Sequence, residues 1–257
     1  MSCRKPLILS TAAGLAFGPA TAFAQCVLTP TAGDDAYVCS SGTAPGLNDP
    51  GGNNQLTFPG GGTGVIAGNV TFGGGADSVI MNSGRIEGAL DQGDGADRLE
   101  IHAGTIAGNV QQGEGIDDFV MTGGEIGSLN QGGSFDTFFM SGGRIVDAFD
   151  DGDSARMTGG RIGRVNMKLA DNLFDMSGGT IDRNLVAGFG NDTIILSGGT
   201  IGGNISVSGG TDSVTITGGS VGGDVLLSVG TDSFTWDGGG VVHGTVDLGG
   251  DNDSARL

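Results

Sequence analysis

A motif of about 20 residues recurs along most of this 257-residue chain. The stretch from Ile181 to Gly199 shows it clearly, because the sequence on both sides repeats its apolar and glycine positions. Its first apolar residue marks ten repeat starts, with steps of 20, 20, 20, 19, 17, 19, 20, 20 and 21 residues. These starts are Ile66, Ile86, Ile106, Ile126, Ile145, Ile162, Ile181, Ile201, Val221 and Val242. Such a period is typical of a solenoid, whose units stack because none can bury its apolar face alone.

Within each unit the apolar residues are spaced as in short β-strands. Near the end of a unit two of them lie two residues apart, as at Ile194 and Leu196, and this spacing indicates a strand rather than a helix. Glycine pairs mark the corners, where the chain needs positive φ or close backbone approach. The sequence therefore predicts an all-β fold, a right-handed parallel β-helix (solenoid) of about ten coils with a period near 20 residues.

The chain divides into three expected segments. Residues 1–24 have the features of a signal peptide, since Arg4 and Lys5 precede an apolar stretch that ends in small residues. Residues 25–62 break the period and are predicted to form an N-terminal cap. Residues 63–257 are the β-helix repeats, which we expect to be truncated at the C-terminal end because the sequence stops in mid-coil.

Cleavage after residue 24 would remove Cys3 and leave Cys26 and Cys39. Because an exported protein folds in an oxidising compartment, we expect these two cysteines to form one disulfide that closes a short loop of the cap. Their wide spacing and the lack of a nearby histidine argue against a zinc site.

The composition narrows the possible partners. The formal net charge is −18, and removal of Arg4 and Lys5 with the signal peptide would make it −20. A chain this acidic is a poor partner for nucleic acid or an anionic membrane surface. It is better suited to solubility or to attraction of divalent cations.

An aspartate recurs at a fixed phase, eleven residues after most anchors. It lies in turns such as Gly188-Phe-Gly-Asn-Asp192, which resemble the nonapeptide of calcium-binding β-rolls. The candidate residues are Asp77, Asp97, Asp117, Asp136, Asp192, Asp212, Asp232 and Asp253, joined by Asp153, with Asn172 as the one substitution. Two interpretations remain open: each carboxylate accepts backbone N–H bonds at its corner, or the column binds calcium. Corner capping alone predicts a chain that folds without calcium.

Catalytic machinery is sparse in this sequence. His102 and His243 are the only histidines and lie seven coils apart, so we expect no catalytic residues and no enzymatic activity. Only the acidic run from Asp147 to Asp153, followed by the basic run from Arg156 to Lys168, resembles the charged groove of a carbohydrate-active β-helix.

Other charged and aromatic residues have simpler interpretations. Glu125, Arg144 and Arg161 fall in one column on successive units and predict an exposed charge ladder. Trp236 occupies an apolar column and is predicted to belong to the core.

The exported start, the off-period segment and the phrase Met-Ser-Gly-Gly-Thr-Ile-x-x-Asn-Leu at Met176 to Leu185 resemble the passenger domains of pertactin-like bacterial autotransporters. The resemblance covers about residues 25–257. It implies a right-handed parallel β-helix at the outer-membrane surface of the cell or in the extracellular medium, commonly used for adhesion. It also implies an outer-membrane β-barrel translocator as a partner, which these 257 residues do not contain.

Three functions follow as hypotheses. The first is a non-enzymatic, exported β-helix that contacts an unknown host or surface ligand without any cofactor. The second is a calcium-binding module similar to a β-roll. The third is a carbohydrate-active β-helix.

Overall fold

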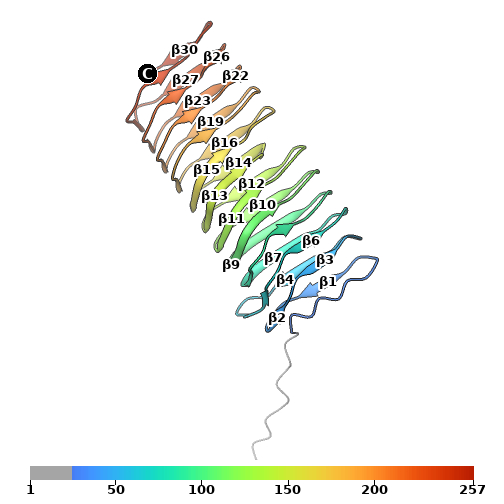
Figure 1. Cartoon of the computed structure of the whole chain (residues 1–257). Coiled ribbons are helices and arrows are strands. Elements are labelled where there is room, and N and C mark those ends of the chain that lie inside the picture. Colours follow the sequence, from blue (N-terminus) through green and yellow to red (C-terminus); the bar gives the residue numbers. More distant parts are fainter. Residues whose placement is uncertain (1–24) are drawn as a thin grey trace, which may run out of the picture.

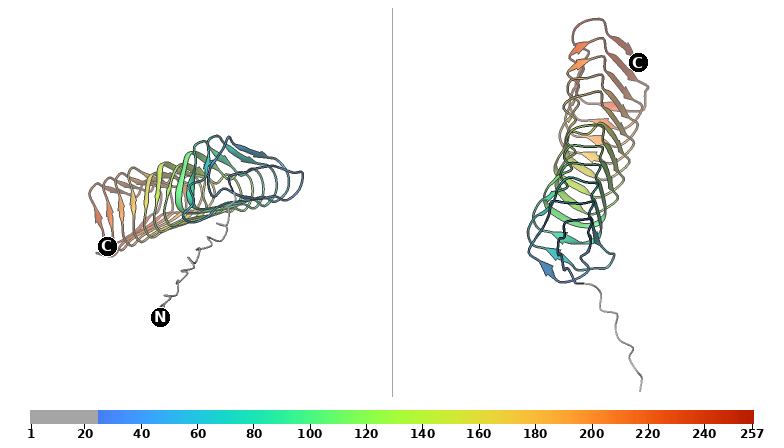
Figure 2. Two further views of the ribbon diagram at one scale, coloured as in Figure 1. Left: turned by 90° about the horizontal axis from the view of Figure 1, so that it is seen from below. Right: turned by 90° about the vertical axis from the view of Figure 1, so that its right-hand side faces the viewer.

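The structure, a computed structural model, describes residues 25–257 as a rod of stacked β-coils (Figure 1). The coils follow one another in chain order from the blue end to the red end, in about 11 turns (Figure 2). Strands of successive coils pair in parallel, and among the described residues there is no helix. This confirms the predicted parallel β-helix. The predicted signal peptide, residues 1–24, lies outside the described residues.

Three parallel ladders run along the rod, one on each side of the coil. The first ladder follows the aspartate column and contains β1 (Ala36–Val38), β4 (Gln55–Phe58), β7 (Ser78–Ile86), β9 (Arg98–Gln111), β10 (Asp118–Met121), β12 (Thr137–Met140), β14 (Ser154–Met157), β16 (Leu173–Met176), β19 (Thr193–Leu196), β23 (Ser213–Ile216), β27 (Ser233–Trp236) and β30 (Ser254–Arg256). Strands β7 and β9 bend round the corner and also join the second ladder.

The second ladder carries the anchor residues, and the third follows it after a short corner. The second contains β2 (Thr43–Ala44), β5 (Val65–Ile66), β11 (Glu125–Asn130), β13 (Arg144–Asp150), β15 (Arg161–Asn166), β17 (Thr180–Ile181), β20 (Thr200–Ile201), β24 (Ser220–Val221) and β28 (Val241–Val242). The third contains β3 (Leu47–Asp49), β6 (Val70–Phe72), β8 (Leu90–Asp91), β18 (Leu185–Val186), β21 (Ile205–Ser206), β25 (Val225–Leu226) and β29 (Val246–Asp247), with β9, β11, β13 and β15 spanning both ladders. The short pair β22 (Gly209–Gly210) and β26 (Val229–Gly230) lies in the aspartate-side turn.

The core is a set of apolar columns that run along the rod axis. The unit at Ile181 buries its anchor, its second-row residue Leu185, Ala187 and the strand pair Ile194 and Leu196. Anchors of neighbouring units pair directly, as at Ile181 and Ile201. In the shortened units Leu129 and Val165 reach the same column through a register shift, as their early positions predict.

The coil stack begins earlier than the predicted boundary at residue 63. Ala36 pairs with Gln55, Gln55 pairs with Ser78, and Ala44 pairs with the anchor Ile66. The register steps here are 19 and 23 residues, and small or polar side chains replace the usual apolar ones, so the repeat is hard to see in the sequence. Cys26 and Cys39 form the predicted disulfide.

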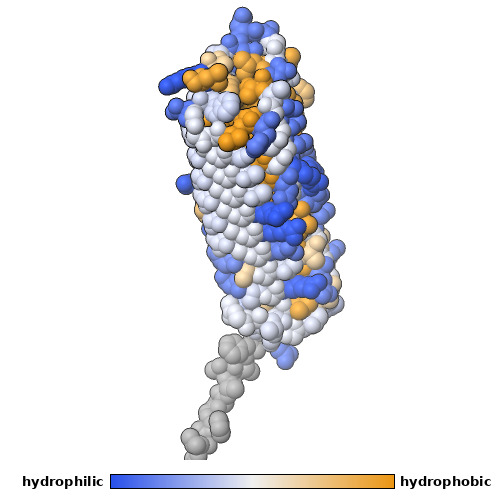
Figure 3. Space-filling view, turned by 90° about the vertical axis from the view of Figure 1, so that its left-hand side faces the viewer, coloured by the Kyte–Doolittle hydropathy of each residue, from blue (hydrophilic) through white to orange (hydrophobic). Residues whose placement is uncertain are grey.

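The last coil exposes part of the core columns. A hollow of about 270 Å³ there is lined by Phe234, Trp236, Val246 and Leu248, among others. Figure 3 shows hydrophobic surface gathered at this end of the rod, whereas most of the same face is neutral. Trp236 packs against the core as predicted, and its indole N–H donates to the Gly240 carbonyl at 3.0 Å. Residues 25–257 include no helix long and apolar enough to cross a membrane.

Candidate functional site: the aspartate corner

The predicted aspartates stack at one corner of the rod, directly before the first ladder. One carboxylate oxygen of each accepts a hydrogen bond from the backbone N–H of its counterpart in the preceding coil. Asp97 Oδ1, for example, accepts from Asp77 N at 2.8 Å, and Asp212 Oδ1 accepts from Asp192 N at 2.8 Å. The same bond is made by Asp77, Asp117, Asp136, Asp153, Asp192, Asp232 and Asp253. The corner-capping interpretation is therefore correct for one of the two oxygens of each carboxylate.

Two members of this column were missed by sequence reasoning. Asn54 Oδ1 accepts from Asp35 N at 3.1 Å, and Asn54 N donates to Asp77, so the column continues into the N-terminal coils. The Gly51-Gly52 pair before Asn54 resembles the turn glycines of later units and was the available signal. Asn172 keeps only the donor half of this pattern, because its backbone N–H donates to Asp192 Oδ1 whereas its own side-chain oxygen is buried without a partner.

The second oxygen of most of these carboxylates is buried without a hydrogen-bond partner. It is the Oδ2 atom of Asp77, Asp97, Asp117, Asp136, Asp192, Asp212 and Asp232. The side chains that carry these oxygens are at most 2% exposed. A buried carboxylate oxygen without a partner costs free energy, and the cost is greatest when the group is ionised. The corner therefore holds a row of oxygens that would gain from a proton or a cation.

The pKa values of the column follow from this burial. Desolvation by burial raises the pKa of Asp97 and that of Asp136 to about 7, with repulsion from neighbouring aspartates adding to the effect. Burial likewise raises the pKa of Asp212 to about 6. The pKa values of Asp77, Asp117, Asp153 and Asp192 also lie above the usual range, again chiefly because of burial. The capping N–H bonds oppose these shifts but do not cancel them.

Glycine is required two residues before most of the aspartates. Gly95 has φ of 151°, and a β-carbon on it would lie 1.5 Å from the Gly75 carbonyl oxygen of the preceding coil. No L side chain fits such a contact. The three positions that depart from glycine in the middle of the rod are Ser134, Asp151 and Ala170, which lie in the 17-residue unit and in the units on either side of it.

At the corner between the second and third ladders, asparagine side chains accept backbone N–H bonds from the following coil, whereas the aspartates accept them from the preceding coil. Asn184 Oδ1 accepts from the backbone N–H of Asn204 in the following coil at 2.9 Å. Asn204 does the same for Asp224, and Asp224 for Thr245. One corner is thus capped by the following coil and the other by the preceding coil.

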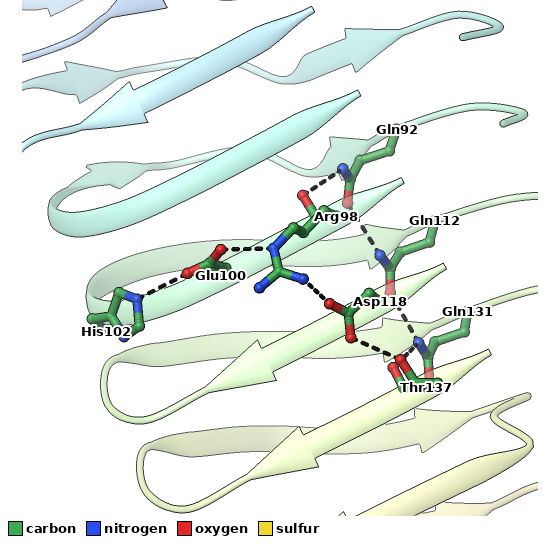
Figure 4. A network of polar contacts seen from close by, with 8 residues as sticks. All are labelled: Gln92, Arg98, Glu100, His102, Gln112, Asp118, Gln131 and Thr137. Carbon is green, nitrogen blue, oxygen red and sulfur yellow. Dashed lines mark hydrogen bonds and ion pairs between the residues drawn. The ribbon is translucent and has the colours of Figure 1, made fainter. Parts of the chain in front are cut away.

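Buried glutamines line the inside of the aspartate turn in three units (Figure 4). Gln131 Nε2 donates to Gln112 Oε1 at 3.2 Å, and Gln112 Nε2 donates to Gln92 Oε1 at 3.5 Å. Gln131 Oε1 ends the series without a partner. The donor would have to come from the next unit, which is the 17-residue one.

The exposed charges form ion pairs, but the predicted column Glu125, Arg144 and Arg161 contains only one of them, because Arg161 stacks on Arg144 and pairs with Asp182 outside the column. Arg144 contacts Glu125 at 3.5 Å, and Arg161 contacts Asp182 at 2.8 Å. Figure 4 shows Arg98 between Glu100 and Asp118, and His102 Nε2 beside Glu100 at 3.2 Å. These solvent-exposed pairs each contribute about 1 kcal/mol or less.

The predicted acidic and basic runs from Asp147 to Lys168 pair with each other and with nearby strands. Arg164 contacts Asp150 at 2.9 Å, and Arg183 reaches Asp147 at 2.6 Å. Lys168 contacts Asp151 at 2.5 Å. Within residues 25–257 no group of three or more histidine, cysteine, aspartate or glutamate side chains converges as a metal site would require.

Comparison with known proteins adds one structural likeness. No protein-family model and no curated protein matches this chain. The chain is similar to the crystal structure of a hyperactive, Ca²⁺-dependent, β-helical antifreeze protein from an Antarctic bacterium, with a TM-score of 0.62 and 20% sequence identity. The match covers 91% of this chain and 86% of that one. At this identity the likeness shows a shared β-helical fold.

Proposed function

We propose that this chain is an exported, non-enzymatic β-helical rod that acts by contact with a surface. The observation that supports it most is the continuous stacking of coils from β1 to β30, in which most of the basic side chains pair with acidic neighbours. A disulfide between Cys26 and Cys39 fits an oxidising compartment. Display at the outer-membrane surface or release into the medium, with help from an outer-membrane translocator, is part of the same proposal.

The test is attachment of beads coated with the exported chain. Coated beads should adhere to cell monolayers or matrix-coated glass above the level of albumin-coated beads, and the soluble chain should compete. A chain that releases sugars from polysaccharides, with no bead attachment, would instead support the carbohydrate-active hypothesis.

A calcium-binding module is the second candidate, and the row of unpaired Oδ2 atoms favours it. Strands of adjacent coils lie about 4.8 Å apart, and calcium binds oxygen at about 2.3–2.6 Å. Oxygens from two successive aspartates, such as Asp192 and Asp212, therefore have a suitable separation for one ion between them. Turn carbonyls and water would have to complete the six to eight ligands. The Ca²⁺ dependence stated for the structural neighbour agrees with this candidate.

Thermal melting in chelator and in millimolar calcium tests the second candidate. At pH 8 calcium should raise the melting temperature by about 5 °C or more if several sites fill. Magnesium is the control, because it demands shorter bonds in a stricter geometry. An unchanged melting temperature would leave capping as the sole role of the column.

We do not propose an antifreeze function for this chain. Binding to a crystal lattice needs a flat surface with a regular repeat. The outward row of the first ladder is irregular over the first half of the rod, with Ile80, Glu100, Val120, Phe139 and Arg156 on successive coils.

A further inference from the structure

The aspartate-side edge of the rod is interrupted by a notch at the 17-residue unit. The shortened turn next to β14 ends short of its neighbours along that edge (Figure 1). The turns before and after it keep their length, and a hollow of about 480 Å³ opens between them. Its lining includes Glu114, Ser134, Asp151, Asp153, Lys168 and Leu169. An adjoining hollow of about 650 Å³ shares Ser134 and Asp153 and is also bounded by Phe135.

The backbone around the notch differs from the rest of the edge. Ser134, Asp151, Lys168 and Ala170 have φ between 55° and 87°, and they are four of the six non-glycine residues with positive φ in residues 25–257. In the regular coils a carbonyl of the stacked turn would occupy the place of a side chain here. At Ala170 the preceding turn is the shortened one, whereas Ser134 follows a turn of full length. Strained backbone of this kind is often concentrated at binding sites.

The floor of the notch carries excess negative charge. Lys168 pairs with Asp151, and no basic side chain of the described residues pairs with Glu114 or Asp153. Asp153 uses Oδ2 to cap Asp136 N at 2.8 Å. The notch therefore presents oxygen acceptors and no free cation.

Exposed apolar side chains stand on both sides of this acidic floor. Phe135 is 58% exposed on one side, and Leu169 is 66% exposed on the other. Two coil spacings separate their turns, which corresponds to about 10 Å. A ligand that crosses the acidic floor therefore meets an apolar side chain on each side of it.

We propose that the notch binds an extended peptide through a lysine or arginine side chain. The cation enters between Glu114 and Asp153, and apolar residues two places before and after it in the peptide rest on Phe135 and Leu169. Alternate residues of an extended chain point the same way and are about 6.7 Å apart, so the two apolar residues lie about 13 Å apart and contact the outer sides of the two turns. The inference rests on the proposed contact function and names a partner class for it.

The probe is the pentapeptide acetyl-Leu-Ser-Lys-Ser-Leu-amide, titrated into the isotopically labelled, exported chain and followed by amide NMR shifts. Saturable binding in about the millimolar range is expected, with the largest shifts at Ser134, Lys168 and Ala170. Replacing the peptide lysine by glutamate should abolish binding, and replacing both leucines by serine should weaken it about tenfold. Absence of saturation with the lysine peptide, or equal binding of all three peptides, would overturn the proposal.

Matched variants locate the site on the chain. Asp153→Asn keeps an oxygen for the Asp136 N–H but removes the charge, and should weaken binding about tenfold. Asp212→Asn is the same change in the same column far from the notch, and should leave binding unchanged. Leu169→Ser should weaken binding. Val229→Ser, at the same turn position but three coils away from Leu169, should not. Equal effects of the near and distant variants would contradict the proposal.

Bead attachment separates this inference from the contact function on which it rests. If beads coated with the wild-type chain and with Asp153→Asn attach equally well to a surface, the contact function is supported and the notch is not the contact site. If the peptide binds at the notch but wild-type beads attach to nothing, the notch stands and the broader contact function fails.

Discussion

Each aspartate of the corner uses its two oxygens differently. In Asp192, Oδ1 accepts the N–H of Asn172, while Oδ2 is buried without a partner. Sequence reasoning treated capping and cation binding as alternatives because it could not assign the oxygens separately. The position of the column and its capping role were predictable from phase and turn chemistry. The unpaired oxygens were not, because they depend on how closely the next coil packs.

Removal of one cap should destabilise the chain locally. Asp192→Ala leaves the buried Asn172 N–H without an acceptor and should lower the free energy of unfolding by about 1–3 kcal/mol. Asp192→Asn keeps an acceptor oxygen and should cost less than half as much. Urea denaturation followed by circular dichroism measures both. Equal losses in the two variants would mean that the N–H bond is not what stabilises the corner.

Gly95 should be far less replaceable than Gly74, which lies in the turn of the preceding coil. Gly95→Ala forces a β-carbon to 1.5 Å from the Gly75 carbonyl at a φ of 151°, so we expect a loss of more than about 3 kcal/mol or failure to fold. Gly74→Ala is the control, because the nearest atom to its β-carbon would be 3.7 Å away. Soluble yield and melting temperature distinguish the two, and similar behaviour would argue against this close coil stacking.

At the scale of strands and turns, the buried column should make stability depend on pH. Asp97 and Asp136 have folded pKa values of about 7, and Asp212 of about 6, against an ordinary value of 3.8. The folded chain therefore binds more protons than the unfolded chain between about pH 4 and pH 7. The stability that these three groups contribute is fully present below about pH 4 and is lost as the pH rises through about 7.

In chelator, the melting temperature should be higher at pH 5 than at pH 8 by about 5 °C. The variant with Asp97→Asn, Asp136→Asn and Asp212→Asn should flatten this dependence, since the amides do not titrate. Calorimetry at the two pH values measures the difference. A higher melting temperature at pH 8 would show that these carboxylates are ionised and stabilised in the folded chain.

The register of the regular coils was predictable because every unit repeats the same apolar columns. The N-terminal coils were not recognised, since Ala44 stands where Ile66 and later anchors stand. The notch was only half visible in the sequence. The 17-residue step and the acidic run at Asp150 to Asp153 were evident, but their position opposite Ser134 and Leu169 depends on the stacking of three coils.

For the molecule as a whole, stability should be local rather than global. Coils of a solenoid contact only their neighbours, so a change at one end is felt mainly there. Reduction of Cys26–Cys39 should increase hydrogen exchange in β1 and β4 while leaving β16 to β23 protected. Exchange followed by mass spectrometry resolves these segments. A uniform loss of protection along the rod would indicate a single cooperative unit.

The two corners that cap in opposite directions have a consequence for how such a chain changes length. In the regular coils after Ile181 the aspartate supplies an acceptor to the coil before it, and Asn184, Asn204 and Asp224 supply one to the coil after it. A whole unit of this kind, inserted by gene duplication, therefore brings one acceptor for each junction that it creates, and its removal leaves the remaining junctions matched. In this part of the rod, length can change in single-coil steps through evolution without leaving a corner uncapped.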